Sequence, residues 1–448
     1  MRQSQSVLAA VLLAGSVFGA VGETEAAGFA LKEQSATALG NAFAGATAAA
    51  EDPSFMFFNP AALGYQDGAQ VQLVLSRIAP RARLEDARAT TVSGTPVGGR
   101  TSKGDIAADE TVPAFYTTYA LDEVWRFGLA LTVPFGLETN YPDNWVGRYH
   151  AIDSKLLTVN IAPTVAARPL PWLSLGLGAQ IQYVEAKLTN AVDFGSIGAA
   201  AGIPGSVPAA QDGRSRLEGN DWGYGFTLGA ILEPRKGTRL GIGYRSEIEH
   251  NLRGDVDFTL DSAGIGAALS AATGRFVDTG ASARLTTPQS VAFGIYQEVD
   301  AQWAVMADVM YTDWNVFDEL RVEFDNPSEA DSVTEEEWKG SWFYAVGATY
   351  RPREDLVFRF GVAYDETPIR TRYRTPRIPG NDRFWLAAGL TWTPSSWFEL
   401  SIGYTHIFVD DSEVRLDTAG AGNTFRAELD ASYENSIDIL TLSADIRF

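Results

Sequence analysis

Residues 357–366 read VFRFGVAYDE, a stretch in which apolar side chains alternate with polar or small ones. One face of an extended strand would carry Phe358, Phe360, Val362 and Tyr364, and the other would carry Arg359, Gly361, Ala363 and Asp365. Successive side chains of a strand point in opposite directions, so the pattern predicts a strand with two unlike faces. The same period of two recurs at 398–406 (FELSIGYTH) and at 440–448 (LTLSADIRF). Soluble sandwiches and membrane barrels both show such alternation.

The connections between these stretches separate the two alternatives. Period and turn residues predict fourteen strands, near 70–78, 112–121, 125–134, 156–167, 173–186, 222–232, 239–254, 280–299, 303–324, 333–350, 356–365, 383–393, 397–409 and 426–448. Every second connection is short, as at 121–124, 168–171, 233–237, 300–302, 351–355 and 394–396, whereas 79–111, 187–221 and 255–279 are long. An even strand count with short turns at one end and long loops at the other is typical of a bacterial outer-membrane barrel. We therefore predict an all-β fold, a 14-stranded antiparallel transmembrane β-barrel, whose closure leaves no unpaired edge in lipid.

Tryptophan positions give a second indication. Five of the 11 Trp lie beside the short turns, namely Trp125, Trp172, Trp303, Trp392 and Trp397. An aromatic girdle at the inner membrane surface would place them there. The alternative is the general preference of Trp for strands. A proline inside a strand, such as Pro288, would mark a bend or bulge.

The first 26 residues have the pattern of an export signal. Arg2 is followed by an apolar region at 7–21, and Thr24-Glu25-Ala26 places small residues where a signal peptidase reads them. Cleavage after Ala26 is favoured over cleavage after Ala27, and the alternative of a membrane anchor would need about 20 apolar residues. We expect a signal peptide at 1–26, a hatch or plug at 27–68 and the barrel at 69–448, in the bacterial outer membrane.

Composition restricts the function. The 448-residue chain has a net charge of −21, no Cys and three His. The negative charge argues against nucleic acid, and against anionic lipid bound through a basic patch. So few His leave little for a His-based metal site or catalytic triad. We expect neither a metal nor a cofactor.

Residues 27–68 show little alternation, yet they contain too many large apolar side chains for a disordered tail. Residues 55–64, FMFFNPAALG, set Asn59-Pro60 inside an apolar run. Proline lacks a backbone N–H and disfavours helix at the preceding residue, so this pair predicts a turn. A barrel of this size encloses more volume than its own side chains fill. We expect the segment to fold inside the lumen, where its aromatic side chains meet an apolar surface or a ligand.

Several segments resemble the FadL family of outer-membrane transporters for long-chain fatty acids and related hydrophobic compounds. The matching residues near the start are Ala27-Gly28-Phe29-Ala30-Leu31, Leu39-Gly40, Ala42-Phe43-Ala44-Gly45 and Asn59-Pro60-Ala61. Residues 218–233, 244–248, 311–317 and 381–392 match in later parts of the chain. Each piece is weak alone, but their order and spacing are specific and span essentially the whole mature chain.

The resemblance implies passive uptake of a hydrophobic ligand, with long-chain fatty acids as the leading substrate. Members of the family capture ligand among extracellular loops, pass it to an inner pocket lined by the hatch, and release it sideways through the barrel wall. The hatch and ligand-binding positions correspond to Ala27, Gly28, Phe29, Asn59, Pro60 and Ala61. A monomer in contact with outer-membrane lipid and lipopolysaccharide is expected.

The lateral opening of the family corresponds to Phe135, Gly136 and Leu137. Gly136 tolerates backbone conformations that break strand pairing, and the nearby Pro134 lacks a donor. A strand that simply ends at a Pro-Phe-Gly turn would explain the same letters.

The sequence also departs from the family. A position that holds Arg in fatty-acid carriers reads Asn190, and Lys187 remains a possible polar contact in the lumen. Glu335-Glu336-Glu337 stands where a cation would serve an anionic ligand better. Neutral alkanes or monoaromatic hydrocarbons are therefore alternative substrates. The apolar loops near 192–211 and 256–272 suggest a binding surface or, equally, loops that pack on each other.

Two other classes of protein compete with a transporter. A lipase-type enzyme needs a nucleophile beside a base, and His150, His250 and His406 lie in no recognisable nucleophile motif. A general porin for polar solutes conflicts with an apolar plug. We expect a protein that is not an enzyme.

Overall fold

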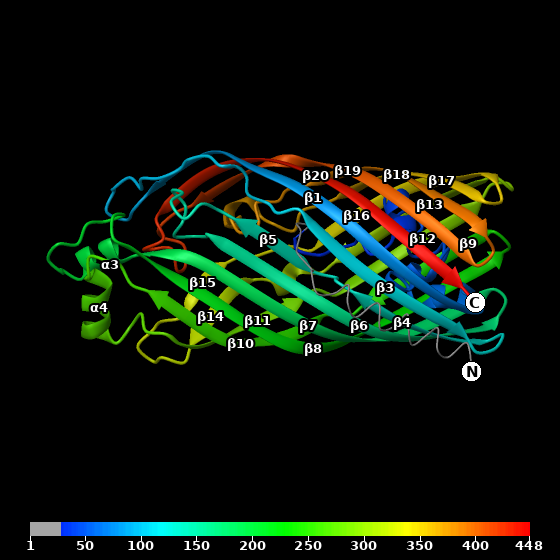
Figure 1. The fold of residues 1–448 in the computed structure, drawn as a ribbon, viewed down its shortest axis with the longest axis horizontal. Helices are drawn as coiled ribbons and strands as arrows, with labels where there is room; N and C mark the ends of the chain where they lie inside the picture. The colour runs from blue at the N-terminus through cyan, green and yellow to red at the C-terminus, as the bar shows by residue number, and fades with distance from the viewer. Residues whose placement is uncertain (1–27) are drawn as a thin grey trace.

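The computed structural model describes residues 28–448, which form a closed antiparallel β-barrel with the N-terminal segment inside it (Figure 1). Nine barrel strands are continuous: β1 (Ala69–Thr90), β3 (Glu110–Ala120), β6 (Asp153–Leu170), β7 (Leu173–Asp193), β8 (Asp212–Arg235), β17 (Leu356–Asp365), β18 (Arg383–Ser395), β19 (Phe398–Leu416) and β20 (Glu428–Arg447). The prediction of a 14-stranded barrel with an N-terminal hatch is confirmed.

The other five barrel strands are interrupted, and each consists of two parts. The pairs are β4 (Trp125–Thr132) with β5 (Gly136–Asn140), β9 (Thr238–Arg245) with β10 (Ile248–Thr259), β11 (Thr279–Thr287) with β12 (Ser290–Glu298), β13 (Trp303–Thr312) with β14 (Glu319–Phe324), and β15 (Ser332–Glu335) with β16 (Ser341–Arg353). The short β2 (Gly104–Asp105) pairs with β1. Pro288 lies in the break between β11 and β12, as the sequence predicted.

Strands β1 and β20 close the barrel. Their register runs from Gln70 opposite Arg447 to Thr90 opposite Glu428, with one shift between Leu84 and Asp86. Strands β1, β7 and β8 extend well beyond their predicted limits, so the connections predicted as long loops are partly strand. Backbone pairing continues there without an apolar period, because the ladder hydrogen bonds do not depend on side-chain type.

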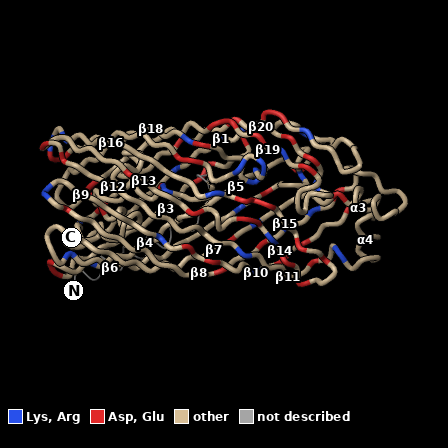
Figure 2. Tube along the Cα trace, turned by 180° about the vertical axis from the view of Figure 1, so that it is seen from behind, with Lys and Arg blue, Asp and Glu red and all other residues tan. Residues whose placement is uncertain are grey.

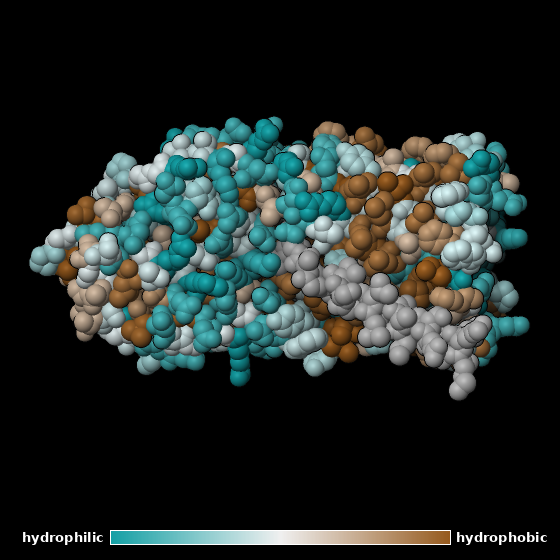
Figure 3. All heavy atoms as spheres, in the orientation of Figure 1, coloured by the Kyte–Doolittle hydropathy of each residue, from teal (hydrophilic) through white to brown (hydrophobic). Residues whose placement is uncertain are grey.

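The two ends of the barrel differ. Short turns lie at the end that holds the C-terminus, and the small helices α3 (Phe194–Ala200) and α4 (Ile265–Thr273) lie at the other end (Figure 1). Charged residues are dense toward the helical end (Figure 2), and apolar side chains gather over the other half of the surface (Figure 3). The five tryptophans beside the short turns are 40% to 58% exposed, as a girdle requires. No helix among residues 28–448 is long and apolar enough to span a membrane.

The N-terminal segment is buried, although it contains little regular structure. It forms helix α2 (Ala36–Gly40) and the 3₁₀ helices η2 (Pro53–Phe57) and η3 (Pro60–Tyr65). Its apolar side chains share one core with inward-facing residues of the barrel, such as Phe343 and Trp385. The turn predicted at Asn59-Pro60 is the start of η3, because Asn59 caps that helix and Pro60 occupies its first position.

Glycines of the barrel wall give this segment its room. An added Cβ would overlap the backbone or a capping side chain of the segment at several of them, among them Gly176 at Pro60, Gly229 at Asn59, Gly241 at Thr47, Gly361 at Asn41 and Gly403 at Ala36. Backbone of the hatch therefore packs directly on backbone of the strands. This explains why small residues occupy the inward positions of an otherwise apolar alternation.

We predict that Gly361→Val displaces the hatch while the barrel stays paired. Valine suits a strand, but its Cβ would collide with the Asn41 carbonyl. Overpacking of this kind costs about 1–3 kcal/mol. Protease cleavage within residues 28–68 should become faster, while far-ultraviolet circular dichroism is unchanged. Gly98→Val is the matched control, since nothing lies within 4 Å of a Cβ at that loop position. Equal protection of both variants would contradict the packing argument.

Candidate functional site

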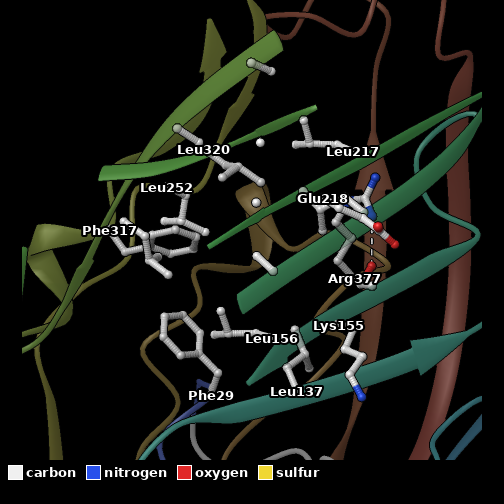
Figure 4. A pocket seen from close by; sticks show the side chains of 18 of the residues that line it. Phe29, Leu137, Lys155, Leu156, Leu217, Glu218, Leu252, Phe317, Leu320 and Arg377 are labelled. Atoms are coloured by element: carbon white, nitrogen blue, oxygen red, sulfur yellow. Dashed lines mark hydrogen bonds between the residues drawn. The ribbon is translucent and has the colours of Figure 1, made fainter. Parts of the chain in front are cut away.

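An apolar pocket lies between the N-terminal residues and the barrel wall (Figure 4). The empty space between its lining atoms, its open mouth included, is about 810 Å³. Phe29 contributes from the hatch, and the wall contributes Leu137, Leu156, Leu188, Leu217, Leu252, Leu285, Phe317 and Leu320. The apolar side chains labelled in Figure 4 surround this space, and they come from the hatch, from several strands distant in the sequence and from the break between β13 and β14. Such a lining suits a hydrophobic ligand, because burial of each CH₂ contributes about 0.8 kcal/mol.

Phe29 is fixed at the pocket by four aromatic neighbours. Its ring centroid lies 4.7 Å from that of Trp314, 5.6 Å from Phe317, 5.7 Å from Trp338 and 5.9 Å from Phe135. Trp314 and Phe317 lie in the break between β13 and β14, and Trp338 lies in the break between β15 and β16. These interruptions of the wall bring the large side chains inward around the hatch.

Gly28 is constrained by the same two tryptophans. Its φ of +66° is one that side-chain-bearing residues rarely adopt, and an added Cβ would meet Trp338 at 2.7 Å and Trp314 at 2.8 Å. Only glycine fits this position without a shift of the rings. Ala27, the predicted mature start, lies outside the described residues.

The wall is interrupted next to Phe29. Strand β4 ends at Thr132, and Phe135 pairs with Ala30 of the hatch in an isolated bridge. Leu31 N donates to Pro134 O at 2.8 Å, and Gly136 N donates to Phe29 O at 2.9 Å. The predicted kink residues Phe135, Gly136 and Leu137 thus join hatch, wall and pocket, since Leu137 also lines the pocket.

The neighbouring strand β3 has a gap in its ladder with β4 and β5 here, although its other edge stays paired with β1. Pairing of β3 with β4 stops at Phe115 opposite Leu131, and pairing resumes only where Ala107 forms a bridge with Thr139. Among the described residues, 110–114 of β3 form no ladder with 132–138. Pro113 and Pro134 both lie in this stretch and lack a backbone donor.

Arg377 supplies a cation to the pocket lining. It comes from the long connection between β17 and β18, and its Nη1 donates to Ser154 Oγ at 2.8 Å and to Asp153 O at 3.3 Å. No carboxylate among residues 28–448 forms an ion pair with it. Burial lowers the pKa of Arg377 to about 10, with nearby Arg426 as a further cause.

Glu336 also lines this pocket and lies in the break between β15 and β16. Its Oε2 accepts a hydrogen bond of 3.0 Å from Trp338 Nε1. Burial raises the pKa of this carboxyl to about 8, so Glu336 is largely uncharged at neutral pH. Residues 335–337 therefore repel an anionic ligand less than three ionised carboxylates would.

Two predicted polar contacts lie away from the pocket. Ala186 and Leu188 line it, so Lys187 points to the opposite face of β7, where its Nζ lies 3.6 Å from Glu218 Oε1. Asn190 Nδ2 donates to Ala191 O at 3.0 Å, and Asn190 is not part of the lining. The side chain of Lys155, although it borders the pocket, extends away from it in Figure 4, and its Nζ lies 3.5 Å from Glu138 Oε2.

The Asn59 motif sits elsewhere in the lumen. Asn59 is fully buried, and its Nδ2 donates to Thr47 O at 2.7 Å and to Ala230 O of the wall at 3.3 Å. Its Oδ1 accepts from Ala61 N at 2.9 Å. Ser174 Oγ donates to Ala61 O at 2.7 Å. The motif therefore ties the hatch to β7 and β8 and contributes no side chain to the pocket.

The apolar loops at the helical end pack on each other. Phe194 of α3, Ile265 and Leu269 of α4, and Phe276 form one buried cluster. Of the two alternatives for these loops, a binding surface or packing of the loops on each other, packing accounts for the burial of these side chains.

Sequence reasoning missed Arg377 as a pocket residue, and Trp314 and Trp338 as the rings that hold Phe29 at the pocket. Trp314 and Phe317 belong to a segment that matched the family, which was a usable signal. No feature of the sequence marked Arg377 as a pocket residue, because only the folding of its loop brings it to the pocket. Among residues 28–448, no group of three or more His, Cys, Asp or Glu could hold a metal ion.

Comparisons with known proteins agree with this geometry. Residues 17–448 match the family described as outer membrane protein transport protein (OMPP1/FadL/TodX). The chain is 29% identical over 402 residues to the long-chain fatty acid transport protein of Escherichia coli K12, covering 85% of this chain and 87% of that protein. It is 30% identical over 392 residues to the long-chain fatty acid transport protein of Salmonella typhi, with the same coverage of 85% and 87%.

Solved structures share the fold. A FadL homologue of Pseudomonas aeruginosa superimposes with a TM-score of 0.85 at 23% identity, over 94% of this chain and 99% of that one. The toluene transporter TodX of Pseudomonas putida gives 0.64 at 17% identity, over 89% and 94%. Fold and family together define an outer-membrane transporter of hydrophobic molecules. The chain belongs to the OMPP1/FadL/TodX family of outer membrane transport proteins.

We predict that Asn59→Ala leaves the barrel folded and reduces uptake of hydrophobic substrate. The variant loses both donors of the side-chain amide, and a buried carbonyl left without its partner costs roughly 1–3 kcal/mol. Uptake by cells and the thermal midpoint of the purified protein are the two measurements. Asn326→Ala, in an exposed loop, is the control. Normal uptake by a folded Asn59→Ala protein would exclude a role in transport.

Proposed function

We propose that this protein carries long-chain fatty acids passively across the outer membrane. The observation that carries this proposal is the apolar pocket with Arg377 at its lining. A fatty acid has an apolar chain and one carboxylate, and the pocket offers an apolar slot and one guanidinium without an ion-pair partner. Relatives named long-chain fatty acid transport proteins, at 29% and 30% identity, support the choice.

Arg377 is suited to this task because its remaining donors are free to serve a ligand. Its Nε and Nη2 make no hydrogen bond within the described part of the chain, while Nη1 holds the side chain in place. Guanidinium and carboxylate form strong, often bidentate hydrogen bonds. The partial burial of the group strengthens such a bond by excluding water.

Uptake of neutral alkanes or monoaromatic hydrocarbons is the second candidate. It is favoured by the absence of Lys187 and Asn190 from the lining, and by the nearly continuous apolar wall. Arg377 would then be a structural group that ties its loop to Ser154.

We further propose that the ligand leaves sideways, at the interruption beside Phe135. Release into periplasmic water would expose the chain at about 0.8 kcal/mol per CH₂, or roughly 10 kcal/mol for a dodecyl chain. An exit beside lipid avoids this step. Residues 111–114 of β3 form no ladder with 132–138, and Pro113 and Pro134 lack a backbone donor, so an exit between these stretches breaks few hydrogen bonds.

Other parts of the proposal concern processing and surroundings. The signal peptide at 1–26 and the mature start at Ala27 remain predictions, as does the division into a hatch at 27–68 and a barrel at 69–448. We propose a monomer whose partners are its substrate, outer-membrane lipid and lipopolysaccharide. Transport alone, without catalysis or a cofactor, is the proposed activity.

The substrate is tested by the uptake of labelled oleate and labelled toluene into cells that express Arg377→Gln. We expect oleate uptake to fall about tenfold, as the loss of a charge-assisted hydrogen bond implies, with toluene uptake unchanged. Arg88→Gln, on the exposed surface, is the control. Equal effects on both substrates would favour the neutral-hydrocarbon alternative.

The exit route is tested by Gly136→Val. A branched side chain at this buried position should block passage past the interruption without removing a pocket residue. We expect ligand binding by purified protein to persist and cellular uptake to be lost. Gly98→Val again serves as the control. Full uptake by a Gly136→Val protein that binds ligand would place the exit elsewhere.

A further inference from the structure

A second cavity lies on the loop side of the apolar pocket and shares Arg377 with it. Its lining comes from the end of β15, from residues 372–377, from residues 415–426 and from His150. We call this cavity the loop chamber. Its charged lining consists of Arg372, Arg377, Arg415 and Arg426 together with Glu335 and Asp417.

Arg426 is held in the chamber by neutral groups alone. Its Nη1 donates to Thr334 Oγ1 at 2.9 Å and to Val333 O at 3.3 Å, and its Nη2 donates to Ser332 Oγ at 2.8 Å. Within residues 28–448, no carboxylate forms an ion pair with it. The guanidinium is thus oriented but keeps its full positive charge.

Arg377 places a second such charge nearby. Each of these two groups is partly buried, and the positive charge of Arg426 contributes to the lowered pKa of Arg377. Burial, followed by the charges of Arg426 and Arg377, lowers the pKa of His150 to about 3, so His150 is neutral. Two like charges enclosed in this way repel each other, and an anion between them would relieve the repulsion.

Other cations at the chamber behave differently. Arg415 forms an ion pair of 2.5 Å with Glu413 and is largely exposed. Arg372 is exposed as well. The anion-binding capacity therefore rests on Arg377 and Arg426, and the lining carboxylates Glu335 and Asp417 disfavour a group with more than one negative charge.

We propose that the loop chamber is an anion-binding site that receives the carboxylate of an amphipathic ligand before the apolar chain settles in the pocket. The choice of a carboxylate rests on the proposed function. Arg377 lines both cavities, so a guanidinium stands where the chamber and the pocket adjoin. Arg426 lines only the chamber, which allows the two cavities to be tested separately.

The test compares decanoate with decanol, which share a chain and differ in charge. Full-length protein in phosphatidylcholine nanodiscs is titrated with each ligand by calorimetry, as wild type, Arg426→Gln, Arg426→Lys and the surface control Arg88→Gln. We expect Arg426→Gln to weaken decanoate binding about tenfold and to leave decanol binding unchanged. Arg426→Lys should recover part of the loss, because it restores the charge without the planar fork.

Two results would overturn the chamber: decanoate binding unaffected by Arg426→Gln, or an equal loss for decanol. Oleate uptake by wild-type cells separates this inference from the proposed function. If wild-type cells take up oleate but decanoate binding does not depend on Arg426, the anion-binding role of the chamber is excluded and the proposed function stands. If the cells take up no oleate but decanoate binding still depends on Arg426, fatty-acid transport is excluded and the anion-binding role of the chamber stands.

Discussion

Backbone hydrogen bonding in lipid is the constraint on which the rest of this structure depends. The hydrocarbon region offers no water to an unpaired N–H or C=O, so a spanning sheet must close on itself. Here β1 meets β20 along almost its full length. A break in the wall is tolerated only where another part of the protein supplies hydrogen-bond partners for the backbone groups at the break. At Pro134 and Gly136 the hatch does so, through Leu31 N and Phe29 O.

This compensation links three features that the sequence presents separately. Residues 28–31 fill the gap in the ladder, and Phe29 within them also lines the pocket. A shift of the hatch would therefore change the pocket and the wall interruption together. The rest of the hatch is anchored by polar contacts with the wall. Asp308 accepts hydrogen bonds from Gly45 N and Thr47 N, and Arg359 pairs with Glu51 at 2.6 Å.

Charged and apolar groups are separated between the loop chamber and the apolar pocket. In this strongly acidic chain, two guanidiniums without ion-pair partners among the described residues line the loop chamber, and one of them, Arg377, also lines the apolar pocket. Glu336 beside them is largely protonated at neutral pH, because burial disfavours its charged form. Beyond Arg377 the lining is nearly all apolar. The charged groups thus lie at the loop chamber, and the lining that suits an apolar chain lies beyond them.

The sequence by itself determined the barrel, its strand number and its sidedness. Alternation and turn length are local properties. The alternation within a single strand, such as 357–366, indicates which of its faces meets lipid. Family resemblance also singled out Phe29, which lines the pocket, and Gly136, which begins β5 after the interruption of the wall. Tertiary structure alone decided the pocket. Arg377, which lines the pocket, and Trp314 and Trp338, which hold Phe29 there, lie 285 to 348 residues after Phe29, in interruptions and loops whose paths depend on long-range packing. The direction of Lys187 also depended on strand register, since a shift by one residue reverses the face on which a side chain lies.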